Sequence, residues 1–94
     1  MPRVFIYAVA DERLTDLHKN ERVAAERIEA LLDVLEEDPG DPRVRRRSVR
    51  AGASQQVQGP VWGFTVRGRD TDYLVLWLAA SDGIEVRYLG ADVF

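Results

Sequence analysis

The 94-residue sequence has no cysteine, a single histidine (His18) and no apolar run long enough to cross a membrane. The absence of cysteine excludes a disulfide framework and any thiolate metal site. One histidine leaves little material for a zinc site or for imidazole catalysis. A membrane-spanning helix needs about 20 consecutive apolar residues, and the apolar segment Val4–Val9 is too short even for the core of a secretion signal. We therefore expect a cytoplasmic protein that uses no metal and no other cofactor.

The composition that remains is that of an ordinary globular protein, with 46% hydrophobic and 31% charged residues. A chain of this length supports one hydrophobic core, because two separate cores would each be too small to be stable. Residues 1–94 should accordingly form a single domain. His18 lies beside an apolar stripe, and we interpret it as a packed or half-exposed helix residue.

The net charge of −3 is the sum of three unequal segments. Residues 1–42 carry eleven acidic and five basic side chains (−6), and residues 70–94 carry five acids and one arginine (−4). Between them, residues 43–69 carry seven arginines and no acid (+7). An all-arginine block is typical of a surface for phosphates or for an acidic protein partner. The alternative is that these arginines are exposed and pair with the acidic helices. The block consists of Arg43, Arg45, Arg46, Arg47, Arg50, Arg67 and Arg69.

Three strands joined by two tight turns are expected in the C-terminal third of the chain. Residues 61–67 and 84–89 alternate between apolar and polar positions. Residues 73–79 are apolar at every position, which is typical of a strand covered on both faces. The links 68–72 and 81–83 contain the glycine and aspartate that tight hairpin turns need. This pattern predicts an antiparallel meander.

The N-terminal half predicts one strand and two helices. Residues 3–10 form a nearly continuous apolar run, typical of a strand inside a sheet. Asp11 is a suitable helix cap, and Leu14 and Leu17 have the spacing of a short amphipathic helix. From residue 21 to 38 the helical period is clear. The apolar stripe of this second helix consists of Ala24, Ile28, Leu31, Leu32 and Leu35.

The prolines of segment 39–42 end the second helix. The arginine block then predicts a short edge strand, followed by a polar surface loop over residues 51–59. This order defines an α+β fold, with two N-terminal helices packed on one face of a mainly antiparallel sheet of four to five strands. The second helix should pack its apolar stripe against residues such as Phe5, Trp62 or Leu76.

The order of these segments, more than any one of them, carries a resemblance to a known family. An apolar first strand precedes an amphipathic helix that ends in Asp38-Pro39, and a basic strand follows. Segments 62–67, 73–77 and 84–90 complete the pattern. The chain thereby resembles, over nearly its whole length, the RelE/ParE superfamily of toxins from bacterial toxin–antitoxin modules. The resemblance implies a RelE/ParE-like fold, a cognate antitoxin as partner, and no small-molecule cofactor.

Two kinds of activity follow from the resemblance. RelE-like members cleave mRNA on the ribosome, which implies a metal-independent endoribonuclease. ParE-like members poison DNA gyrase instead, so the alternative is a relative without nuclease activity, directed at gyrase or at another protein. At Leu74 and at Ala91-Asp92 the chain lacks basic residues that are common in the family. A third hypothesis is a nucleic-acid-binding module unrelated to toxins, with Trp62 or Tyr73 stacking on bases.

Cleavage through the ribose 2′-OH requires a base, cations that stabilise the pentavalent phosphate, and an acid for the leaving oxygen. By the resemblance, Arg67, Arg50 and Tyr88 are the candidate catalytic residues. The alternatives are a solvent-facing arginine at position 67 and a core tyrosine at position 88, since Tyr88 alternates with Ile84 and Val86. The candidate nucleic-acid-binding residues are Arg43, Arg45, Arg47 and Arg69.

Overall fold

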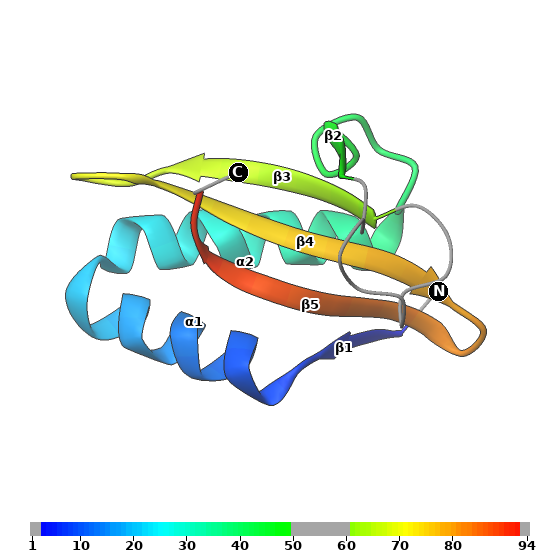
Figure 1. The fold of residues 1–94 in the computed structure, drawn as a ribbon, viewed down its shortest axis with the longest axis horizontal. Helices are drawn as coiled ribbons and strands as arrows, with labels where there is room; N and C mark the ends of the chain where they lie inside the picture. The colour runs from blue at the N-terminus through cyan, green and yellow to red at the C-terminus, as the bar shows by residue number, and fades with distance from the viewer. Residues whose placement is uncertain (1–2, 50–60, 93–94) are drawn as a thin grey trace.

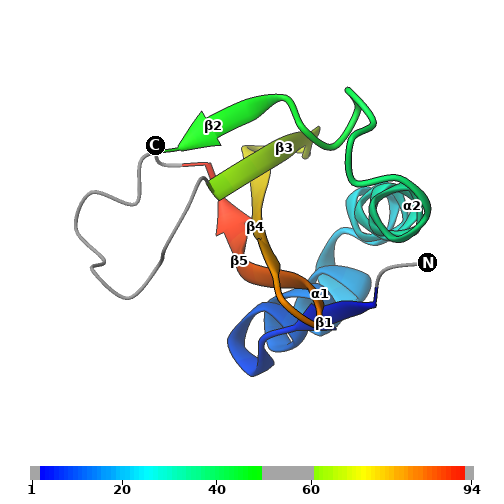
Figure 2. The same ribbon diagram turned by 90° about the vertical axis from the view of Figure 1, so that its right-hand side faces the viewer.

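The computed structural model of the chain describes residues 3–49 and 61–92 and has an α+β fold (Figure 1). Two helices cover one face of a five-stranded sheet with the order β1-β5-β4-β3-β2 (Figure 2). The β1–β5 pair is parallel, and the other three pairs are antiparallel. The predicted class, helix placement and antiparallel meander are therefore confirmed. The elements are β1 (Val4–Ile6), α1 (Ala8–Asn20), α2 (Arg22–Glu37), β2 (Arg47–Val49), β3 (Val61–Arg67), β4 (Asp72–Ala80) and β5 (Gly83–Ala91).

Strand β1 is shorter than predicted and lies at the edge of the sheet. The strand expected over residues 3–10 ends at Ile6, and α1 begins before Asp11, which lies in its first turn and not at its cap. The cap position is Tyr7, which makes no side-chain capping hydrogen bond. Phe5 and Tyr7 remain 44% and 41% exposed. The apolar run is thus not covered on both faces, as an interior strand would require.

Helix α2 forms where its apolar period predicts. Its stripe faces the sheet and belongs to the main core, together with Phe64 and Trp77 of the central strands. Of the expected contact residues, Trp62 packs against this core. The other two expectations are wrong, because Phe5 is exposed and Leu76 lies in a separate cluster. The buried members of the stripe are Ala24, Ile28, Leu32 and Leu35, and Leu31 is partly buried.

Strand β4, whose residues are apolar on both faces, is buried on both faces. Val75 and Trp77 point into the main core beneath the helices. The residues between and beside them form a second cluster with Val61. This arrangement confirms the interpretation of segment 73–79 as a strand covered on both sides. The β4 members of the second cluster are Leu74, Leu76 and Leu78.

A β-bulge in the β4–β5 pair determines the face on which Tyr88 lies. Leu76 pairs with Tyr88, but the next residue, Trp77, pairs with Val86, so Arg87 is an extra residue in β5. Because one extra residue reverses the alternation, Tyr88 packs against the second cluster. The predicted alternation that placed Tyr88 on the same face as Val86 is therefore wrong.

The segment after α2 is mostly a turn, and only its end is a strand. β2 forms the predicted edge strand and pairs with the start of β3. Before it, the Val44 side chain is buried in the main core. The loop expected over residues 51–59 lies outside the described residues. Among the helices of the described ranges, none has the length and apolar character needed to cross a membrane.

Candidate anion-binding site

A hollow of about 570 Å³ lies where the link between α1 and α2 meets the β3–β4 hairpin. Figure 1 shows both segments at the same end of the molecule, on the left of the view. The hollow is lined by five basic residues and a single acidic residue, Glu21. We call this feature the basic hollow. Its basic residues are Lys19, Arg22 and Arg27 from the helices and Arg67 and Arg69 from the hairpin.

Two tight turns bring these charges together. The helices are joined through Glu21 alone, so the end of α1 and the start of α2 lie side by side at the hollow. In the hairpin, the Gly68 N–H donates a hydrogen bond to the Thr71 carbonyl oxygen at 3.0 Å. A Cβ atom at position 68 would lie 2.3 Å from that oxygen, so the turn requires glycine. The hairpin thereby places Arg67 and Arg69 on either side of this glycine.

The hollow has one wall from the helices and another from the β3–β4 hairpin, and Glu21 connects the two. Its Oε1 accepts a hydrogen bond from the backbone N–H of Arg69 at 2.6 Å, and its Oε2 accepts one from the Tyr73 hydroxyl. The Tyr73 ring lies against Gly68, where a Cβ would meet it at 2.5 Å. The acid of the hollow is therefore bonded to the hairpin backbone and to a part-buried phenol.

The electrostatic environment of the hollow favours anions. Arg22 forms an exposed ion pair with Glu26, at 3.1 Å between Nε and Oε1. Among the described residues, none forms an ion pair with the other four cations of the hollow. The first turn of α2 also lines the hollow, and the N-terminus of a helix carries unpaired N–H groups and partial positive charge. Arginine forks bind phosphate in particular, because their planar donors match its oxygens.

The arginine block predicted from the sequence does not form one surface. Arg67 and Arg69 line the basic hollow, whereas Arg47 pairs with Gly63, four residues earlier on β3. At about 3.3 Å per residue, these two parts of the block lie roughly 13 Å apart along the strand. Of Arg47 the structure describes only the strand pairing, and the candidate catalytic residue Arg50 lies outside the described residues.

Two arginines of the block are engaged in local contacts. Arg43 donates to the Asp41 carboxyl from its backbone N–H at 2.8 Å and from its guanidinium at 2.9 Å. The side-chain hydrogen bonds from Arg43 lower the pKa of Asp41. Arg45 donates from Nε to the Pro39 carbonyl oxygen at 3.1 Å, and its guanidinium lies 4.7 Å from the centre of the Trp62 ring. Arg43 and Arg45, two of the four candidate nucleic-acid-binding residues, are thus engaged in contacts of the segment after α2.

Tyr88 does not lie beside Arg67. Its hydroxyl donates a hydrogen bond to the Ala91 carbonyl oxygen at 2.7 Å, and its ring packs on the second cluster. Arg67 pairs with Asp72 on β4, and Tyr88 pairs with Leu76 on the same strand. With about 3.3 Å per residue and 4.8 Å per strand, their Cα atoms are roughly 16 Å apart. The structure therefore does not bring two of the three candidate catalytic residues together.

The helices supply the residues of the hollow that the sequence did not single out. Lys19, Arg22 and Arg27 lie in a segment with a net charge of −6, which conceals them. The available signal was the break in the helical pattern at Lys19-Asn20, which places cations at a helix–helix link. The topology then brings the tip of the arginine-bearing hairpin to that link.

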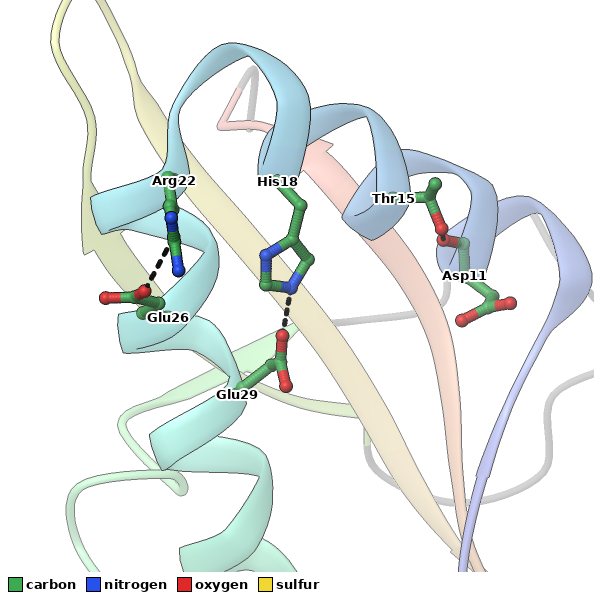
Figure 3. Close-up of polar contacts among 6 residues, drawn as sticks. All are labelled: Asp11, Thr15, His18, Arg22, Glu26 and Glu29. Carbon is green, nitrogen blue, oxygen red and sulfur yellow. Dashed lines mark hydrogen bonds and ion pairs between the residues drawn. The ribbon is translucent and has the colours of Figure 1, made fainter.

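His18 lies outside the hollow and joins the two helices (Figure 3). Its Nε2 contacts the Oε1 of Glu29 on α2, and both side chains are exposed. Figure 3 also shows Arg22 and Glu26 side by side on α2. The interpretation of His18 as a half-exposed helix residue agrees with this geometry.

Comparison of the chain with protein-family models, with curated proteins and with solved structures gave no match.

Proposed function

We propose that the chain is a RelE-like toxin of a toxin–antitoxin module that binds RNA through the basic hollow and cuts mRNA on the ribosome. The observation that carries this proposal is that five basic residues from two helices and a hairpin line one hollow. The order of the elements, strand, helix, helix and four strands, is that of the RelE/ParE resemblance and supports a RelE/ParE-like fold. A cognate antitoxin in the bacterial cytoplasm is the expected regulatory partner.

The chemistry of the hollow suits the sugar–phosphate backbone of RNA. Arg67 and Arg69 can donate to phosphate oxygens in the geometry that guanidinium groups favour. During cleavage, negative charge grows on the nonbridging oxygens of the phosphate, and positioned cations stabilise it. In the proposed reaction these two arginines and Lys19 supply that stabilisation, water accepts the 2′-OH proton and returns a proton to the leaving 5′-oxygen, and no metal ion takes part.

The alternative is a relative of the same fold without nuclease activity, directed at DNA gyrase or at another protein. One observation favours it: the Cα atoms of Arg67 and Tyr88 lie roughly 16 Å apart by the strand spacings. The Tyr88 hydroxyl donates to the Ala91 carbonyl oxygen, and Tyr88 does not line the basic hollow. In this alternative the basic hollow binds an acidic segment of the target protein.

Expression in a bacterial host tests the proposal. Wild-type protein should arrest growth and leave cut mRNA, and Arg67→Gln should relieve both effects. Arg13→Gln is the matched control, because Arg13 is exposed on α1 outside the hollow and the change in charge is the same. Growth arrest with intact mRNA would favour the gyrase-directed alternative. Normal growth with folded, soluble wild-type protein would contradict a toxin of either kind.

A further inference from the structure

We infer that Glu21 is a positioning residue of the basic hollow, which holds its two cationic walls at the separation that binds phosphate. The inference rests on the proposed function, because it concerns the same hollow. It assigns to the one acid of the site a role in binding anions, opposite to the effect that its charge alone would have.

The contacts of Glu21 run between the two walls. Glu21 is the single residue between α1 and α2, on the wall that carries Lys19. Its carboxylate accepts hydrogen bonds from the backbone of Arg69 at 2.6 Å and from the Tyr73 hydroxyl. These partners are 48 and 52 residues away in sequence and belong to the other wall. Hydrogen bonds to a carboxylate are stronger than neutral ones, so they restrain the hairpin against the helix link.

The carboxylate does not have the local role that its position offers. Glu21 precedes the first residue of α2, the position from which a capping side chain accepts hydrogen bonds from the first turn of the helix. The Glu21 side chain makes no such bond. Both of its oxygens are directed to the hairpin instead.

The charge of Glu21 on its own opposes the proposed ligand. A carboxylate among five basic residues repels a phosphate and reduces the positive potential of the hollow. Removing it should therefore tighten RNA binding if charge alone decides. If Glu21 instead fixes Arg67 and Arg69 relative to Lys19, removing it leaves the hairpin wall free to move. Binding then has to order that wall, and affinity falls.

Tyr73 allows the two effects to be separated. Its hydroxyl donates to Glu21, and its ring lies under the hairpin turn against Gly68. Tyr73→Phe removes the hydroxyl without changing any charge. A loss of affinity in this variant therefore reports the restraint on the hairpin and not the potential of the hollow.

The experiment measures the affinity of a short, fluorescein-labelled single-stranded RNA by anisotropy between about 50 and 200 mM salt, where phosphate contacts dominate the salt dependence. We expect Glu21→Ala to weaken binding about tenfold and Tyr73→Phe about fivefold, as expected when hydrogen bonds to a charged group are lost. Glu21→Gln keeps an acceptor and should recover part of the affinity. The slope of log K against log salt is negative when phosphate contacts are made, and it should become shallower by about one in Glu21→Ala, because a phosphate contact is lost.

The outcomes are distinct from failure of the proposed function. If the wild type does not bind, or if Arg67→Gln binds as well as the wild type, the proposed function fails. If Arg67→Gln weakens binding but Glu21→Ala tightens it, only the role of Glu21 is overturned. Unchanged affinity in Tyr73→Phe, with thermal unfolding and circular dichroism like those of the wild type, would also overturn it.

Discussion

The indole Nε1 of Trp77 donates a hydrogen bond to the backbone carbonyl oxygen of Val44 at 2.9 Å, and both residues are fully buried. This bond joins the centre of the sheet to the segment that follows α2, 33 residues earlier in the chain. Arg45 continues the contact, because its guanidinium lies 4.7 Å from the ring centre of Trp62 and 5.6 Å from that of Trp77. The first part of the arginine block therefore has a structural role.

Replacing Trp77 with phenylalanine should destabilise the protein by about 2–4 kcal/mol, since it leaves a buried carbonyl oxygen without a donor and creates a cavity. Trp62→Phe is the control, because Trp62 is only partly buried at the edge of the core. Urea unfolding followed by circular dichroism measures both changes. Equal stability losses in the two variants would show that the bond to Val44 has no particular importance.

Truncation of Leu32 tests the packing of α2. Leu32 is 8% exposed and lies in the main core, so Leu32→Ala should cost about 2–5 kcal/mol. Val23 on the same helix is 63% exposed, and Val23→Ala should change stability by less than about 0.5 kcal/mol. Denaturant midpoints of the two variants provide the comparison. A loss below about 1 kcal/mol for Leu32→Ala would contradict the packing of this face on the sheet.

Gly83 is required at the turn between β4 and β5. Its φ of +148° disfavours any side chain, and a Cβ would lie 2.3 Å from the Arg3 carbonyl oxygen. That oxygen accepts a hydrogen bond from the Ile84 N–H at 2.7 Å, where β1 begins to pair with β5. Gly83→Ala should cost about 1–3 kcal/mol, seen as a lower melting temperature. Gly40→Ala is the control, since its Cβ would meet only the Asp38 side chain, at 3.3 Å. Equal melting temperatures for the two variants would contradict the required close approach.

The Asp41–Arg43 pair should be visible in an acid titration. The side-chain hydrogen bonds from Arg43 lower the pKa of Asp41 in the folded protein below its ordinary value of 3.8. The pair therefore stabilises the fold above pH 3.8, and this contribution is lost as the pH falls through the lower, folded-state pKa. NMR titration of the Asp41 carboxyl should give a midpoint below 3.8, and Arg43→Gln should raise it. Identical midpoints in the two proteins would contradict the assignment.

The fold could largely be read from the sequence because its patterns are local. The stripe of α2 predicts Ala24, Ile28, Leu32 and Leu35 as buried, and the structure agrees. The alternation of β3 holds from Phe64 to Arg67, whereas Gly63 is buried on the face expected to be polar. The errors arise where a nonlocal feature overrides the pattern. A bulge opposite Leu76 and Trp77 moved Tyr88 to the other face, and pairing at the sheet edge left Phe5 exposed.

The site was harder to predict because it combines segments that are far apart in the chain. The sequence singled out Arg67 and Arg69 but grouped them with Arg43 and Arg45, which precede them by more than twenty residues. Only the antiparallel pairing shows that the segment after Arg45 lies beside the start of β3, whereas Arg67 lies at the end of that strand. No local pattern reveals that the hairpin tip meets the link at Glu21, because that contact depends on the lengths of the helices and the strands.

The salt dependence of RNA binding tests most directly whether the basic hollow binds phosphate. Affinity of the wild type for single-stranded RNA should fall steeply as salt rises, with a slope of log K against log salt that becomes shallower by about one in Arg67→Gln. Arg13→Gln makes the same change in net charge on α1 and should keep the wild-type slope and affinity. Equal affinities and slopes in Arg67→Gln and Arg13→Gln would contradict the assignment of the basic hollow as the RNA site.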